Sequence, residues 1–210
     1  MKKFLSFILI ICLCLGLASC ANTFKKSEAA TEAKPQIDAA ALYDDVNKGD
    51  WYEDAVSWGV SEDVMTPAKP NLFGVDNPMT RAEVVLAMWK AAGSPGRVNS
   101  AKAVADDSSD SDISKALEWA VSEGILTREQ VSYTSAVLTR QDALDYMYIE
   151  ADSPAVQSQT AAYSDVSADN SSVRWAKDSG ITYGIGHGLF GPELSCTKAM
   201  MITFLFRAKP

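Results

Sequence analysis

The chain has 210 residues, an acidic formal charge of −8 and a single histidine. An acidic balance argues against a nucleic-acid partner and against a polybasic patch that would hold the protein on a membrane surface. With one histidine, no catalytic combination of Ser, His and Asp or of Cys and His stands out. We therefore expect a protein that is not an enzyme, with no cofactor and no metal site.

The first segment is typical of a targeting sequence. Lys2 and Lys3 form a charged start, and residues 4–17 form an apolar run that is too short to span a membrane. The end of this run, Leu17-Ala18-Ser19-Cys20, resembles the lipobox of bacterial lipoproteins. This resemblance implies that residues 1–19 are removed as a signal peptide and that lipid is attached to Cys20. The mature chain would then be anchored to the extracytoplasmic face of a membrane.

Residues 20–41 predict a flexible tether, because they are polar and alanine-rich and show no apolar period. At about 3.5 Å per residue such a tether reaches at most ~70 Å, so a partner must lie close to the membrane. Loss of Lys2 and Lys3 with the signal peptide takes the formal charge from −8 to −10.

The rest of the chain contains three copies of one pattern. Each copy holds a first helix with a tryptophan, a turn, a short loop around an aromatic residue, and a second helix that begins with Thr and a cation. The first and third copies have identical spacing from tryptophan to aromatic to threonine, and the middle copy is looser. The copies span residues 42–95, 103–154 and 162–210. The tryptophans are Trp58, Trp119 and Trp175, the loop aromatics Phe73, Tyr133 and Phe190, and the threonines Thr80, Thr139 and Thr197.

Local signals place the ends of the second helices. Thr80 is an N-cap, Glu83 completes a capping box with it, and Gly93 ends the helix. Thr139 with Asp142 repeats the box, whereas Thr197 keeps the cap without the acid. The apolar face predicted for the helix after Thr80 consists of Val84, Val85, Met88, Trp89 and Ala92.

The first helices give weaker signals. In the first copy we expect Asp50 to cap a helix whose apolar stripe is Trp51, Ala55 and Trp58. In the middle copy the stripe is Ile113, Leu117 and Val121.

A cation directly follows each capping threonine: Arg81, Arg140 and Lys198. It occupies the first helical position, where free N–H groups and the helix dipole are already positive, so helix stability alone would not select it. Free amides beside a fixed cation form a site for a carboxylate or phosphate. Recurrence in all three copies favours this interpretation. The alternative, capping boxes with incidental surface cations, stays open.

These residues resemble the S-layer homology module, which occurs as three tandem repeats in bacterial surface proteins. The resemblance depends on Tyr-x-Asp-Val at Tyr43 and Tyr163, on the tryptophan helices, on Gly124-Ile125 and Gly180-Ile181, and above all on Thr80-Arg81-Ala82-Glu83. It covers about residues 42–210. It implies a mainly α fold in which three helix-loop-helix repeats form a pseudo-threefold bundle.

The resemblance also implies a ligand. Modules of this family bind secondary cell-wall polysaccharide, often pyruvylated, in grooves between repeats, and the basic residue of their Thr-Arg-Ala-Glu motif is thought to meet the acidic sugar. That role would fall to Arg81 and Arg140, and at Lys198 the charge remains without the planar fork. The threonines Thr80, Thr139 and Thr197 belong to the same sites. Trp58, Trp119 and Trp175 are either sugar-stacking rings or core residues.

Three hypotheses for the function follow. The first is a non-catalytic envelope lipoprotein that ties the membrane to an acidic wall polymer. The second uses the same fold as a protein-interaction module for an envelope protein or a host surface, and predicts an exposed apolar patch away from the three cations. The third, a glycosidase with paired carboxylates, is disfavoured because the three repeats occupy the whole chain after the tether.

Overall fold

The computed structural model describes residues 37–96, 111–156 and 160–209. The predicted signal peptide, Cys20 and most of the tether lie outside these residues. The described segments contain seven α-helices and one 3₁₀-helix, and their β-structure is limited to isolated bridges. No helix in these segments has the length and apolar character needed to cross a membrane. The predicted mainly α fold is confirmed.

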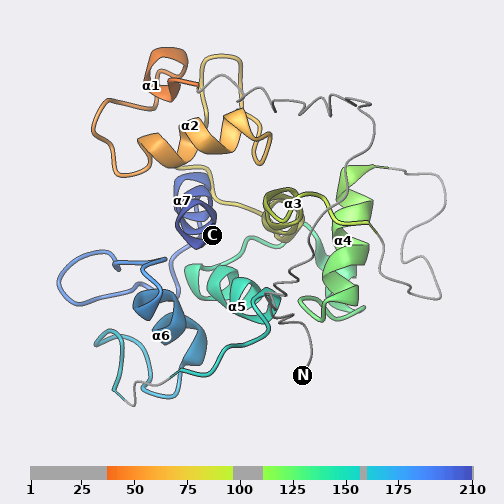
Figure 1. Cartoon of the computed structure of the whole chain (residues 1–210), viewed down its shortest axis with the longest axis vertical. Coiled ribbons are helices and arrows are strands. Elements are labelled where there is room, and N and C mark those ends of the chain that lie inside the picture. Colours follow the sequence, from red (N-terminus) through yellow and green to blue (C-terminus); the bar gives the residue numbers. More distant parts are fainter. Residues whose placement is uncertain (1–36, 97–110, 157–159, 210) are drawn as a thin grey trace, which may run out of the picture. The chain divides into compact units, whose positions relative to one another are not determined.

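The helices form three pairs, preceded by the short helix α1 (Figure 1). Each pair has a first helix, a connecting loop and a second helix. The connecting loops are residues 62–80, 123–139 and 179–197. The first helices are α2 (Glu53–Ser61), α4 (Asp112–Ser122) and α6 (Ser171–Asp178). The second helices are α3 (Arg81–Ala91), α5 (Arg140–Glu150) and α7 (Lys198–Ala208). The other two are α1 (Ala39–Leu42) and η1 (Gln130–Tyr133), which lies in the second loop.

The second helices begin where the sequence predicts. Thr80 accepts a hydrogen bond from the Glu83 amide, and the Glu83 carboxylate accepts one of 2.8 Å from the Thr80 amide. Thr139 and Asp142 form the same capping box, and Thr197 caps α7 without a reciprocal acid. The predicted apolar face of α3 is buried, except that Ala92 is the exposed C-cap of the helix.

The first helices differ from the prediction. Asp50 does not cap α2, which begins at Glu53, because its carboxylate accepts from the Asn47 amide at 2.8 Å within the preceding turn. Trp51 lies before the helix and is exposed, so it is not part of the apolar stripe. Ile113 is likewise exposed at the start of α4, whereas Leu117 is buried.

The folded region also begins earlier than the sequence indicates. Ala39 is fully buried, and its amide donates to the Ser57 hydroxyl of α2 at 3.1 Å. The Ile37 amide donates in the same way to the Ser61 hydroxyl. The last residues assigned to the tether, 37–41, are therefore folded against α2 and shorten the predicted linker.

Packing between the pairs is cyclic. The first helix of each pair packs on the second helix of another pair: α4 on α3, α6 on α5, and α2 on α7. Figure 1 shows α3, α5 and α7 on the inside, with α4, α6 and α2 beside them on the outside. The last contact joins the first pair to the third and closes the set. Each pair therefore completes its core only with its neighbours.

Candidate functional site

The first two amides of each second helix donate to carbonyl groups of a neighbouring loop. In α3, the N–H groups of Arg81 and Ala82 donate to the carbonyls of Ala136 at 2.8 Å and Thr134 at 3.0 Å. The equivalent acceptors are Leu194 and Pro192 for α5, and Asn77 and Val75 for α7. The third amide of each helix bonds to its capping threonine. These amides hold a loop of the protein, which corrects the expectation that they are free for an anion.

Two of the motif cations donate to the same loops. The Arg81 guanidinium donates from Nη1 to the Tyr133 carbonyl at 2.6 Å. The Lys198 ammonium donates to the carbonyls of Thr66 and Phe73, both at 2.7 Å. Burial lowers the pKa of Lys198, because the charged form has lost part of its hydration. Arg81 thus holds the loop of the second pair, and Lys198 holds the loop of the first.

Arg140 completes this arrangement and is only 3% exposed. Its Nε donates to the Phe190 carbonyl at 2.9 Å. The guanidinium carbon lies 4.7 Å from the centre of the Phe190 ring and 5.2 Å from that of Phe204. Burial lowers the pKa of Arg140. Each motif cation therefore fixes the loop of the next pair, and the three contacts form a cycle.

The aspartates of the Tyr-x-Asp-Val segments also bind two of these loops. Asp45 accepts from the backbone N–H groups of Phe73, Gly74 and Val75 at 2.8, 2.6 and 3.0 Å. Asp165 accepts in the same way from the amides of Phe190 and Gly191. Burial raises the pKa of Asp45, but these backbone bonds outweigh it, so its pKa lies below its usual value. The corresponding residue of the middle copy, Asp106, lies outside the described residues.

The three tryptophans have mainly packing roles. Trp119 is 5% exposed, so neither face of its ring is open to a sugar, and its candidacy as a stacking residue is corrected. Trp58 is half-buried with its ring 5.8 Å from that of Phe206, and Trp175 packs in the same way on Tyr148 at 5.7 Å.

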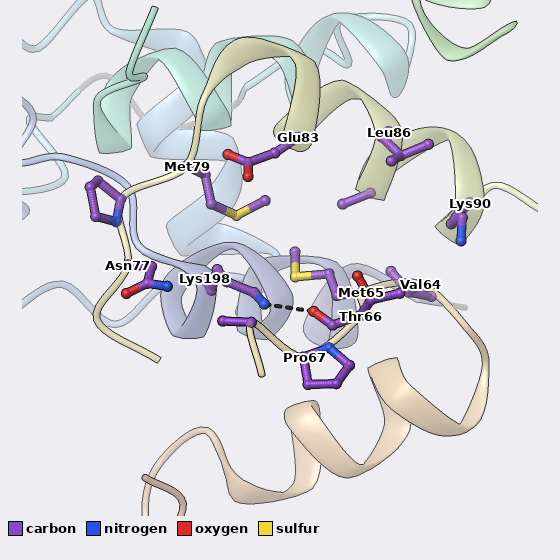
Figure 2. Close-up of a pocket in the computed structure, with 13 residues that line it drawn as sticks. Val64, Met65, Thr66, Pro67, Asn77, Met79, Glu83, Leu86, Lys90 and Lys198 are labelled. Carbon is purple, nitrogen blue, oxygen red and sulfur yellow. Dashed lines mark hydrogen bonds between the residues drawn. The ribbon is translucent and has the colours of Figure 1, made fainter. Parts of the chain in front are cut away.

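Two cavities lie at equivalent positions of the first and third pairs. The α3 groove encloses about 440 Å³ between α3, the loop after α2 and Lys198 (Figure 2). The α7 groove encloses about 470 Å³ between α7, the loop after α6 and Arg140. When the repeats are aligned on the motif cations, Lys90 of the first groove corresponds to Arg207 of the second, and Glu83 corresponds to Met200. Each groove is therefore walled by the motif cation of one pair and the second helix of the next.

The charges of the two grooves differ. In the α3 groove, Lys90 forms an ion pair of 2.9 Å with Asp63, and Glu83 adds a second carboxylate beside Lys198. The α7 groove is lined by Arg140 and Arg207, and no Asp or Glu occurs among its described lining residues. An anion would therefore meet a more positive surface in the α7 groove.

Exposed rings also distinguish the α7 groove. Tyr183 is 73% exposed and Trp51 is 57% exposed, and both line it. The guanidinium carbon of Arg207 lies 4.6 Å from the centre of the Tyr183 ring. Both rings are largely exposed, and a flat aromatic ring suits the C–H face of a sugar. Neither ring was predicted as a binding residue. Trp51 was assigned to the apolar stripe of the first helix, and Tyr183 aligns with Thr66 in the identically spaced first copy.

One side chain of the α7 groove carries a hydrogen-bonding group that is not satisfied. Thr203 lies on α7, lines the groove and is 1% exposed. Its hydroxyl has no hydrogen-bond partner in the described part of the chain. Buried hydroxyl groups are normally paired, so this one needs an explanation.

Comparison with known proteins supports the resemblance seen in the sequence. Residues 42–85 and 162–200 match the model of the S-layer homology domain. A comparison with curated proteins gave no significant match. The S-layer homology family consists of non-catalytic modules of the cell surface that bind secondary cell-wall polysaccharide. Two segments of the chain are therefore similar to the S-layer homology domain, the first including Arg81 and the second Lys198.

Proposed function

We propose that the protein is an envelope lipoprotein whose S-layer homology repeats bind an acidic secondary cell-wall polysaccharide, and that the α7 groove is the principal binding site. The bundle comprises three repeats in pseudo-threefold arrangement, with residues 103–154 as the middle one. Support for the middle repeat comes from its capping box, from Arg81, which binds its loop, and from Arg140, which binds the loop of the next pair.

The main support for the proposal is the positive charge of the α7 groove. Arg140 and Arg207 face a cavity whose described lining residues include no acid, beside the exposed rings of Trp51 and Tyr183. In this site Arg207 binds the carboxylate of the sugar, because its side chain is only half-buried, and Arg140 supplies positive potential from the wall. The rings stack on the sugar faces. The overall negative charge does not prevent this contact, because charge fields are screened over about 8 Å in physiological salt.

The remaining motif residues serve the site indirectly. Arg81 and Lys198, with the caps Thr80, Thr139 and Thr197, fix the loops that wall the grooves. The α3 groove is the weaker site, because Asp63 and Glu83 compensate its lysines. Lipid on Cys20 would tie this wall-binding module to the membrane, with residues 21–36 as the tether.

Co-sedimentation with purified sacculi tests the proposal. The unlipidated protein, residues 21–210, should bind intact sacculi and lose binding once the secondary polymer is stripped. Arg207→Met should weaken binding roughly 10- to 100-fold, the effect of removing a hydrogen bond to a charged group. Lys90→Met is the matched control at the equivalent position, and should change binding by less than about threefold because Asp63 already neutralises Lys90.

A second candidate function is an interaction module for an envelope protein. Tyr133 and Val137 supply exposed apolar side chains for it, although they lie on the loop held by Arg81 rather than away from the three cations. That function predicts binding to stripped sacculi that is undiminished and indifferent to Arg207. Such a result would refute the polysaccharide proposal and direct the search to a protein partner.

A further inference from the structure

One helix position differs in chemistry between the three second helices. Alignment on the motif cations places Leu86 of α3, Asp145 of α5 and Thr203 of α7 at the same point. Leu86 and Thr203 line the two grooves. The two groove walls therefore differ in polarity at this position.

The polar residue in α5 has a structural explanation. Asp145 accepts a hydrogen bond from the Gln141 side chain at 2.7 Å and another from the Ser172 hydroxyl of α6. It joins α5 to the first helix of the next pair. Its polarity is thus explained by contacts inside the protein.

Thr203 has no such explanation. Its hydroxyl is buried without a partner in the described residues, and a buried hydroxyl that lacks a hydrogen bond destabilises a folded protein. Leu86 shows that an apolar side chain can fill the same position of the groove. The hydroxyl therefore lowers the stability of the free protein, and no hydrogen bond within the described residues compensates for this loss.

A ligand in the α7 groove can provide the missing hydrogen-bond partner. The side chains next to Thr203 along its wall, Met200 and Phe204, are apolar, so the hydroxyl is the one neutral hydrogen-bonding group of α7 that lines the cavity. Threonine in a helix populates two χ1 rotamers, and rotation between them turns the hydroxyl in a different direction. Rotation at Cβ can therefore present the hydroxyl to a ligand in the groove.

We propose that Thr203 is a specificity-determining residue that hydrogen-bonds a neutral polar group of the bound glycan, while Arg207 binds its acid. This inference depends on the proposed function of the α7 groove. It predicts that Thr203 strengthens ligand binding but lowers the stability of the unbound protein. A purely structural threonine would not show these opposite effects.

Thr203→Val separates the two effects, because valine keeps the shape and removes the hydroxyl. The variant of the 21–210 protein should melt about 2–4 °C higher, as expected when a domain of this size gains about 1 kcal/mol. It should bind the polymer released from sacculi about 3- to 10-fold more weakly, the effect of losing one neutral hydrogen bond. Thr203→Ser keeps the hydroxyl and should bind within about twofold of the wild type.

The outcomes distinguish this inference from the proposed function. Failure of the wild-type protein to bind the released polymer would overturn both. If the wild type binds but Thr203→Val binds equally well, or melts at a lower temperature, the role of Thr203 is refuted and the groove remains. Loss of binding in Thr203→Ser as well as in Thr203→Val would show that packing of the side chain, rather than its hydroxyl, affects the site.

Discussion

Replacement of Arg140 by alanine should destabilise the fold more than it alters any exposed ligand contact. The substitution removes the hydrogen bond of 2.9 Å to the Phe190 carbonyl and leaves that acceptor unpaired. A bond from a charged donor contributes about 1.5–3 kcal/mol, and cation–π contacts with buried rings add about 2 kcal/mol. Since the terms are not additive, we expect a loss of about 3–5 kcal/mol, a large part of the 5–15 kcal/mol typical of a domain.

Urea denaturation followed by far-ultraviolet circular dichroism measures this loss. Arg140→Ala should lower the midpoint without a large change in the denaturant slope. Arg128→Ala is the matched control, because Arg128 is an exposed arginine of the second loop, and it should change stability by less than about 0.5 kcal/mol. A stable Arg140→Ala protein, within about 1 kcal/mol of the wild type, would refute the structural role and return Arg140 to the predicted anion site.

Two further predictions test the loops and the core. Asp45→Asn should remove part of the acid sensitivity of the fold. Because the pKa of Asp45 is lowered, its contribution is complete above the unfolded value near 4 and is lost as pH falls through the lower folded pKa. Melting temperatures measured from pH 6 to pH 2 should therefore fall less steeply in the variant, and parallel curves would contradict this assignment. Trp119→Ala should cost about 3–5 kcal/mol in urea denaturation, as for a core aromatic residue. An unchanged midpoint with weaker polymer binding would instead show that Trp119 contacts the sugar.

The helices that could be predicted are those whose signals are local. Thr80 and Glu83 are close in sequence and satisfy each other, so their capping box does not depend on the rest of the fold. The predicted start of α2 was wrong for the converse reason. The Asp50 carboxylate accepts a hydrogen bond from the Asn47 amide in the preceding turn, and this bond competes with capping of the helix. Local signals therefore identify an element only where one arrangement of donors and acceptors dominates.

The site residues were harder to predict because their environment comes from distant segments. Arg81 meets the carbonyl of Tyr133, and Lys198 meets that of Thr66, in contacts that form only after the three pairs close. Nothing local distinguishes Tyr183 as an exposed ring or Thr203 as an unpaired hydroxyl. The repeat alignment does, however, map Arg207 onto Lys90, and it could have identified both grooves once one of them was known.

The cyclic contacts also explain why a cation follows each capping threonine. At the start of an isolated helix that cation is unfavourable, because it adds to the positive end of the dipole. In the bundle, loop carbonyls approach both the helix amides and the cation, and their partial negative charge offsets this cost. The recurrence of Thr-cation is thus accounted for by assembly of the repeats. The residues proposed to bind the ligand lie further along each helix and can vary independently of these contacts. There, Lys90 and Arg207 have different partners, and Leu86 and Thr203 differ in polarity.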